Sequence, residues 1–170
     1  MKKIAIIYGT NLGTTELIAK KINDLIKYPT TLIDVTKIDV DFVNQHDILL
    51  LGTSTWGTGD IHDAWLEFDF KKLDVNNKTF LLFGCGDSQT YPYTFCDGVG
   101  RLFDILNRKK AKIIGQINKE DYEYDFEESK AVFKNKVVGL LIDQDSQPEK
   151  TDWRIEKWTT WINENLKSLL

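Results

Sequence analysis

The residues best suited to binding a ligand are the small and hydroxylated ones of Thr10–Thr15, which read Thr-Asn-Leu-Gly-Thr-Thr. They follow an apolar run, Ile4–Ile7, that is typical of a strand buried on both faces. A helical pattern comes next, with apolar residues on one face at Leu17, Ile18, Ile22, Leu25 and Ile26. A short turn between a strand and a helix forms a nest of backbone N–H groups at a positive helix end, and such a nest binds phosphate.

The kind of phosphate is indicated by the charges of this segment. No lysine or arginine lies between Thr10 and Ala19. Neutral hydroxyls and the helix end would hold the phosphate, which favours a monoester over a nucleoside triphosphate that needs a lysine and Mg²⁺. On these residues alone, an ordinary turn rich in threonine explains the pattern equally well.

Two aromatic residues lie in polar turns that follow other apolar runs. Trp56 belongs to the turn 53–60, and Tyr91 belongs to the turn 86–92. In open parallel sheets, ligands bind beyond the carboxyl ends of the strands, so the three turns are expected to converge. Two flat rings beside a phosphate nest can hold a planar heterocycle between them. Each ring taken alone is more often a packing residue.

Other residues with reactive side chains lack the partners that chemistry requires. His46 and His62 are isolated, share no spacing typical of metal ligands, and are expected at the surface or at an edge. Cys85 and Cys96 have no histidine nearby and are interpreted as small buried apolar residues. No metal site and no catalytic residue is therefore predicted. Carboxylates on or just after the turns form either a solvated face or an electrostatic field around the ligand: Asp60, Asp63, Glu67, Asp69, Asp87 and Asp97.

The elements that position these turns alternate between strands and helices. Apolar runs predict strands at Ile4–Ile7, Thr30–Asp34, Asp47–Gly52, Lys78–Gly84, Ala111–Gly115 and Val137–Ile142. Helical spacing predicts helices after Thr15 and at Asp63–Phe70, Thr94–Arg108 and Asp152–Leu169, with a loop and a short helix in Val35–Gln45. This alternation favours an α/β fold with a parallel sheet covered on both faces. About twenty polar and acidic residues, Gln116–Lys136, interrupt the pattern and are unusually many for a connection inside a domain.

Two helices have predicted inner faces. In the helix at 63–70, Trp65, Leu66 and Phe68 are expected to point inward. The last helix, capped by Thr151 or Asp152, is expected to bury Ile155, Trp158, Ile162, Leu166 and Leu169. Trp153, Trp158 and Trp161 are all expected to pack on the sheet rather than bind a ligand.

Size and charge narrow the class of protein. The 170 residues, of which 42% are hydrophobic, suit one well-buried domain spanning 1–170 and are too few for two. The net charge of −4 argues against nucleic acid and anionic membranes as partners. The two cysteines have neither the number nor the spacing of a disulfide framework, so we expect a cytoplasmic protein with reduced thiols.

Taken together, these segments resemble the flavodoxin family. Ile6–Ala19 looks like the family's phosphate-binding signature, and Thr55–Gly59 resembles its first flavin loop. Gly86–Tyr91, followed by Phe95-Cys96-Asp97, resembles the second flavin loop. The interruption before Val137 looks like the insertion of the long-chain subgroup, closely so over Tyr124–Ala131. Because Gly139–Asp145 and the last helix continue the match, the resemblance covers essentially the whole chain.

The resemblance implies a flavodoxin-like, doubly wound, five-stranded parallel sheet of order 2-1-3-4-5, with helices on both faces and a long insertion in the last strand. It also implies one non-covalent FMN and low-potential one-electron transfer between a reductase and acceptor enzymes. Such a carrier has no substrate of its own. The redox partners would dock transiently on an acidic face of a monomer.

The same resemblance assigns site residues by position. The phosphate would be held by Thr10, Asn11, Leu12, Gly13, Thr14 and Thr15. Trp56 and Tyr91 would flank the isoalloxazine ring. The ring would also contact Thr55, Gly57, Thr58, Gly59, Cys85, Gly86 and Asp87, with Thr94 and Cys96 at its edge and Asp145 near the ribitol.

Three departures from the family pattern affect these expectations. Leu12 replaces a common threonine, so one phosphate hydroxyl is missing, and Ser54 stands where proline is frequent. Gly57 follows the tryptophan where many long-chain members have a larger residue. A glycine lets the Gly57–Thr58 peptide reorient easily, which predicts a well-stabilised semiquinone. The flavin loops contain no lysine or arginine, which predicts a low potential for the second electron.

Two other functions remain open from the sequence. A phosphate-binding regulatory domain of the same fold would make Trp56 and Tyr91 incidental, and a colourless protein would support it. A flavin-dependent quinone reductase would show steady turnover of NAD(P)H and quinone without a separate reductase. A phosphatase is disfavoured because the chain has no Cys-x5-Arg loop.

Overall fold

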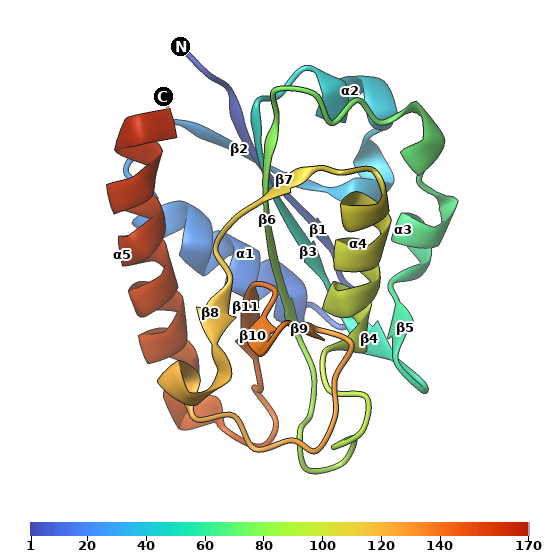
Figure 1. The fold of residues 1–170 in the computed structure, drawn as a ribbon, viewed down its shortest axis with the longest axis vertical. Helices are drawn as coiled ribbons and strands as arrows, with labels where there is room; N and C mark the ends of the chain where they lie inside the picture. The colour runs from blue at the N-terminus through green and yellow to red at the C-terminus, as the bar shows by residue number, and fades with distance from the viewer. Residues whose placement is uncertain (170) are drawn as a thin grey trace.

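The computed structural model describes residues 1–169 and is built on a central parallel sheet. The strand order is β2-β1-β3-β6-β11, with β7 also paired to β6 (Figure 1). The strands are β1 (Ile4–Gly9), β2 (Thr30–Asp34), β3 (Ile48–Thr53), β6 (Thr79–Cys85), β7 (Lys112–Ile113) and β11 (Leu140–Ile142). Counted by their place in the sheet, these strands confirm the predicted order 2-1-3-4-5.

The last strand of the sheet is made of two separate pieces. Strand β7 pairs with Thr79 and Phe80 at the start of β6, whereas β11 pairs with Phe83–Cys85 at its end. The residues between them fold as a second, antiparallel sheet of order β8-β10-β9. Its strands are β8 (Ile117–Asn118), β9 (Val132–Phe133) and β10 (Lys136–Val137), with a 3-10 turn η3 (Lys119–Tyr122). The insertion predicted from the sequence therefore interrupts the last strand.

One boundary of the predicted last strand is wrong. Val137 was expected in the main sheet, but it lies in β10 and pairs with Ile117 and Val132. The chain then reaches the main sheet through Gly139, where a Cβ would lie 2.0 Å from the Leu82 carbonyl oxygen. Gly139 thus lies against the backbone of β6, between the end of β10 in the small sheet and the start of β11.

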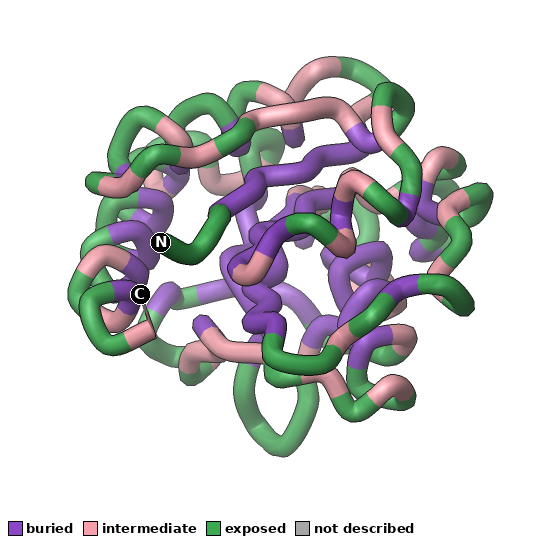
Figure 2. The backbone as a smooth tube through the Cα atoms, turned by 90° about the horizontal axis from the view of Figure 1, so that it is seen from above, coloured by how far each residue is buried: buried purple, intermediate pink, exposed green. Residues whose placement is uncertain are grey.

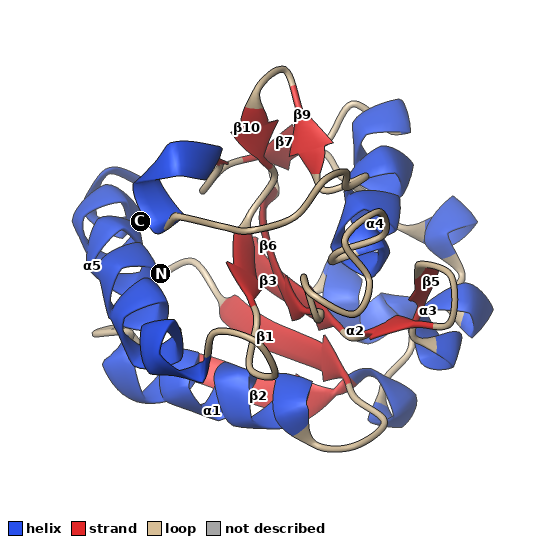
Figure 3. Cartoon of the chain, turned by 90° about the horizontal axis from the view of Figure 1, so that it is seen from below, coloured by secondary structure: helices blue, strands red, loops and turns tan. Residues whose placement is uncertain are grey.

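Helices cover both faces of the sheet. Helices α1 (Thr14–Leu25) and α5 (Thr151–Leu169) lie on one face, and α2 (Val40–Asn44), α3 (Asp63–Glu67) and α4 (Asp97–Arg108) lie on the other (Figures 1 and 3). Alternate residues of each strand enter opposite cores, because successive side chains of a strand point to opposite faces. In β1, Ile4 and Ile6 join the core under α1 and α5, whereas Ala5 and Ile7 join the core under α4. Figure 2 shows these central strands buried throughout.

Short elements complete the chain. Strands β4 (Thr55–Trp56) and β5 (Asp60–Ile61) form a hairpin after β3. Further 3-10 turns are η1 (Val35–Lys37), η2 (Phe70–Lys72) and η4 (Pro148–Lys150). Within residues 1–169, no helix is both long and apolar enough to cross a membrane.

Helix α3 is shorter than predicted and buries a different set of residues. It ends at Glu67 because Phe68 adopts an extended backbone, with φ −68° and ψ 130°. Trp65 is buried, and the Phe68 ring packs against it. Leu66 is exposed, contrary to the prediction, because one turn of helix cannot turn adjacent residues toward the same core.

Other predicted positions also change. Helix α4 begins at Asp97 rather than Thr94, because Cys96 has a left-handed φ of 54°. In α5, Trp158 is fully buried as predicted, whereas Trp153 and Trp161 are exposed, contrary to the prediction, and the Trp153 ring packs against Tyr122 instead. His46 and His62, which were expected at the surface or an edge, are both buried. The Nδ1 atom of His46 lies 2.9 Å from the Phe42 carbonyl oxygen, which gives its buried ring a polar partner.

Candidate functional site

A cavity of about 280 Å³ lies at the carboxyl ends of β1, β3, β6 and β11. It is lined by residues of the three turns found in the sequence and of the loop after β11. These are Thr10, Asn11, Leu12, Thr14, Thr15, Ser54, Thr55, Trp56, Gly57, Cys85, Gly86, Asp87, Tyr91, Thr94, Phe95, Cys96, Gln144 and Asp145. The cavity therefore occupies the place where open α/β sheets bind ligands.

The first turn presents backbone donors at the start of α1. Gly13, the N-cap, has φ 91°, and its N–H donates to Thr10 Oγ1 at 3.0 Å. In the described structure no side chain caps this helix, so its first N–H groups are left for a ligand. A Cβ on Gly13 would meet nothing within 4 Å, so it is the left-handed φ that favours glycine there.

The second turn is a hairpin fixed at its far end. The N–H of Gly59 donates to the Trp56 carbonyl at 3.0 Å, and Arg101 Nε donates to the Gly59 carbonyl at 2.7 Å. Gly57 has φ 51° and lies at the cavity, whereas Gly59 packs against the side chain of Asp97. The Trp56 side chain stays 42% exposed beside the cavity, as expected for a ring that contacts a ligand.

The third turn is organised by the Asp87 carboxylate. Its Oδ1 accepts from the N–H groups of Gln89 and Thr90 at 3.2 and 3.0 Å, and from Ser146 Oγ at 2.7 Å. Burial raises the pKa of Asp87, but the hydrogen bonds from Thr90, Ser146 and Gln89 outweigh burial and lower the pKa overall. Asp87 is therefore held as an anion that joins the third turn to the loop after β11.

The insertion supports the third turn from outside. The N–H groups of Glu127 and Glu128 both donate to the Pro92 carbonyl at 2.9 Å. Ser129 Oγ donates to the Phe95 carbonyl, and the Phe95 ring packs against Phe126 with centroids 5.0 Å apart. The insertion thus fixes the segment that carries Tyr91, Thr94 and Cys96.

The charge around the cavity is negative. None of the described residues that line it is a lysine, arginine or histidine. Burial raises the pKa of Asp145, and the charges of Asp87 and Asp143 raise it further. Burial also raises the pKa of the Cys85 thiol to about 11 and that of Cys96 well above its usual range. A ligand that gains negative charge here would be repelled by charges of the same sign.

Most predicted site residues meet at this cavity. All of them line it except Gly13, which caps α1, and Thr58 and Gly59, which lie in the hairpin turn. Whether they contact a cofactor stays a prediction. Three lining residues were not predicted: Ser54, Phe95 and Gln144. Each of the three directly precedes a predicted residue, which was the available signal, and Phe95 also stood in the segment that resembles the second flavin loop.

Comparison with known proteins identifies the family. The family model described as "Flavodoxin" matches residues 6–158. The chain is 40% identical to a flavodoxin of Buchnera aphidicola, over 95% of this chain and 96% of that one. It is 39% identical to Flavodoxin 1 of Escherichia coli K12, over 95% and 93%. The crystal structure of Fusobacterium nucleatum flavodoxin bound to flavin mononucleotide superposes with a TM-score of 0.88 at 31% identity, over 97% and 99% of the chains. This chain belongs to the flavodoxin family.

Proposed function

We propose that this protein binds one FMN without a covalent bond and carries single electrons between other redox proteins. The observation that carries the proposal is the pairing, in one cavity, of an uncapped helix N-terminus with two exposed aromatic rings, Trp56 and Tyr91. FMN supplies the electron chemistry when bound, and the protein supplies binding, orientation and electrostatics.

The residues present fit a flavin nucleotide. Thr10, Thr14 and Thr15 offer hydroxyls next to the free N–H groups of α1, which suits a phosphate monoester. At Gly86, a Cβ would lie 2.8 Å from the backbone nitrogen of Cys96, so the two backbone segments approach each other in the wall of the cavity. A side chain at residue 86 would therefore force Cys96 and Phe95, which also line the cavity, to move.

Each predicted residue has a role in this proposal. Thr10–Thr15 hold the phosphate, Trp56 and Tyr91 cover the faces of the ring, and Asp145 lies near the ribitol. The ring is also contacted by Thr55, Gly57, Thr58, Gly59, Cys85, Gly86 and Asp87, and its edge is contacted by Thr94 and Cys96. All belong to one FMN-binding domain that spans the chain.

The hairpin gives the protein a way to respond to the charge and protonation of the ring. The carbonyl of Gly57 can turn toward or away from the cavity by rotation of the Gly57–Thr58 peptide, because glycine tolerates many backbone conformations. Arg101 holds the Gly59 carbonyl, so the rest of the hairpin keeps its place while this peptide turns. Turned inward, the carbonyl oxygen would accept a hydrogen bond from an N–H group of a bound ring.

The negative surroundings favour a low potential for the second electron. Asp87 and Asp145 line the cavity, and no cation of the described residues lines it to offset them. Additional negative charge on a bound ring is therefore opposed. We further propose that the protein is a monomer in the cytoplasm, where Cys85 and Cys96 stay reduced, and that its partners dock transiently on an acidic face.

Reconstitution with FMN tests the function. The proposal expects a yellow complex that takes up two electrons at two separated potentials, and that passes electrons to an acceptor only after a separate reductase loads it. A protein that binds no flavin would contradict it. Steady oxidation of NAD(P)H by quinone without a reductase would point to a quinone reductase instead.

A further inference from the structure

His62 lies beneath the first turn although it is distant from that turn in sequence. Its side chain is buried at the end of the β4–β5 hairpin, where it is also the N-cap of α3. The imidazole packs against Gly9: a Cβ added there would lie 2.9 Å from two atoms of the ring. Gly9 therefore allows His62 to reach the turn that follows β1.

The hydrogen bonds of His62 define which of its nitrogens carries the proton. Nδ1 lies 3.2 Å from the N–H of Ala64, which can only donate, so Nδ1 accepts. Nε2 lies 3.1 Å from the Thr10 carbonyl oxygen, which can only accept, so Nε2 carries the proton and donates. The neutral imidazole thus satisfies both partners at once.

The backbone of His62 is fixed as well. Its N–H donates to Thr53 Oγ1 at 3.2 Å, and its carbonyl accepts from the N–H of Trp65 at 2.9 Å. The backbone of His62 is consequently held by β3 and α3, and its ring is held by α3 and by Thr10 after β1. A donor held from three elements can fix the orientation of the peptide that it binds.

That peptide is the one between Thr10 and Asn11. It is trans, as are all peptide bonds in the described chain, so its N–H points opposite to its carbonyl. With the Thr10 carbonyl bound to His62, the Asn11 N–H points away from His62, and Asn11 lines the cavity. A rotated peptide would instead direct a carbonyl oxygen toward a bound phosphate.

We infer that His62 is a positioning residue for the phosphate of the flavin nucleotide. It holds the Thr10 carbonyl away from the phosphate so that the Asn11 N–H can join the donors of α1. The inference rests on the proposed function, because it assumes that a flavin monophosphate occupies the cavity. His62 itself touches neither the phosphate nor the ring.

Two variants separate the role of each ring nitrogen. In His62→Asn, the side chain ends near the position of Nδ1, so it can still cap α3 but cannot reach Thr10. In His62→Gln, the amide nitrogen extends to the position of Nε2 and can donate to the Thr10 carbonyl. His62→Ser, another good N-cap, repeats the Asn test if that variant does not fold, and circular dichroism of the flavin-free protein checks folding.

The measurement compares FMN with riboflavin, which has the same ring but no phosphate. For His62→Asn we expect the Kd for FMN, measured by quenching of flavin fluorescence, to rise about tenfold, while the Kd for riboflavin changes less than about twofold. For His62→Gln we expect a Kd for FMN within about twofold of that of the protein without a substitution. Selective loss of FMN affinity with rescue by glutamine would support the inference.

Other outcomes overturn it. Equal weakening of FMN and riboflavin by His62→Asn would show that His62 shapes the cavity in general. Unchanged affinity for both would show that the Thr10 peptide needs no support. If the protein without any substitution binds neither flavin, that result would instead overturn the proposed function, and the inference with it.

Discussion

The thiol of Cys85 combines a position at the cavity with very low acidity. Burial raises its pKa to about 11, although the hydrogen bond with Thr15 lowers it somewhat. At pH 8 the thiolate is then about 100-fold scarcer than for an ordinary thiol of pKa 9.0. Since the thiolate is the nucleophile, we expect iodoacetamide to modify Cys85 of the flavin-free protein about 100-fold more slowly than a cysteine peptide, as read by mass spectrometry of the peptides.

The pH profile separates this explanation from simple blocked access. The rate should keep rising with pH up to about 11, because ionisation is what limits it. Thr15→Val removes the hydroxyl that lowers the pKa, so it should slow the reaction further at each pH. A rate that levels off near pH 9 would contradict a raised pKa.

Gly57 offers a second test at the scale of one residue. Its φ of 51° lies in the left-handed region, which a β-branched residue avoids and asparagine tolerates. Gly57→Val should therefore deform the hairpin and lower the fraction of one-electron-reduced flavin at half-reduction severalfold, as read from visible spectra during a redox titration. Gly57→Asn, the matched variant, should retain most of that fraction. Equal fractions in the valine variant and the unchanged protein would rule out a role for this peptide.

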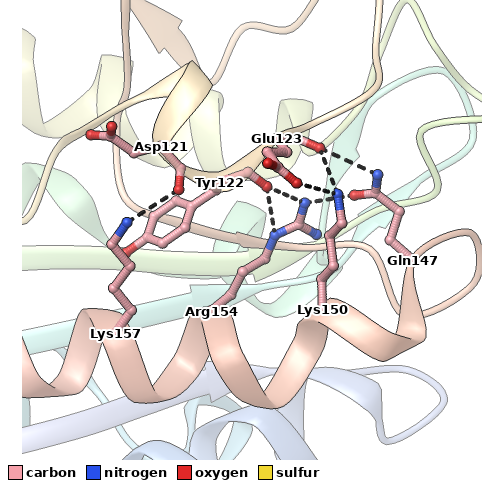
Figure 4. Close-up of polar contacts among 7 residues, drawn as sticks. All are labelled: Asp121, Tyr122, Glu123, Gln147, Lys150, Arg154 and Lys157. Carbon is pink, nitrogen blue, oxygen red and sulfur yellow. Dashed lines mark hydrogen bonds and ion pairs between the residues drawn. The ribbon is translucent and has the colours of Figure 1, made fainter.

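At the scale of elements, the insertion is anchored to α5 by a buried arginine (Figure 4). Arg154 is fully buried, and its Nε and Nη2 atoms donate to the Tyr122 carbonyl at 3.2 and 2.6 Å. Nη2 also donates to Gln147 Oε1 at 2.6 Å, and the guanidinium lies 4.2 Å from the centroid of the Tyr124 ring. Burial lowers the pKa of Arg154, and Nη1 has no hydrogen-bond partner within the described residues. This one side chain joins the insertion, α5 and the loop after β11.

Replacing Arg154 should show what this anchor contributes. Arg154→Ala leaves a cavity and takes the donors from the buried Tyr122 carbonyl and the half-buried Gln147 side chain, so we expect the free energy of unfolding to fall by about 3 kcal/mol. Arg154→Met keeps most of the volume and removes the cost of a buried charge, so it should cost about 1 kcal/mol. Chemical denaturation measures both, and limited proteolysis should cut 116–136 faster in the alanine variant.

Lys157 provides the matched control on the same helix. It is exposed and donates to the Asp121 carbonyl at 3.2 Å (Figure 4), so Lys157→Ala should change stability by no more than about 0.5 kcal/mol. An alanine variant at 154 as stable as this control would mean that the other contacts of the insertion hold it without the arginine.

The elements also show where prediction from the sequence succeeds. Buried parallel strands are continuous apolar runs that end in polar turns, so β3, β6 and the cavity beyond them follow from composition. The small sheet of the insertion does not, because its strands have two residues each and carry no period to detect. His62 was misplaced for a different reason: its partner is a backbone carbonyl 52 residues away, which no pattern of side chains reveals.

At the scale of the whole molecule, the chain has a net charge of −4, and some of its carboxylates lie near the cavity. Asp60, Asp63 and Glu67 are exposed on the β4–β5 hairpin and α3, and Asp60 pairs across the hairpin with Trp56, which lines the cavity. Asp60 is partly offset by Arg101, whose Nη2 lies 3.4 Å from the carboxylate, whereas the structure gives Asp63 and Glu67 no ion pair among the described residues. We define these three carboxylates as the acidic face.

Neutralising the acidic face should change both docking and potential. Replacing Asp60 and Asp63 by Asn and Glu67 by Gln should slow electron transfer to a small basic haem protein about tenfold at low salt, because steering depends on these charges. The potential of the second electron should rise, since negative charge near the ring is removed. The control is the same three-charge change at the exposed Asp24 of α1 and at Glu156 and Glu164, which line the groove between the end of α1 and α5. Stopped-flow rates of all three proteins should converge in about 0.5 M salt, where screening acts within a few ångströms. Equal slowing by both triple variants would mean that total charge, rather than this face, guides the partner.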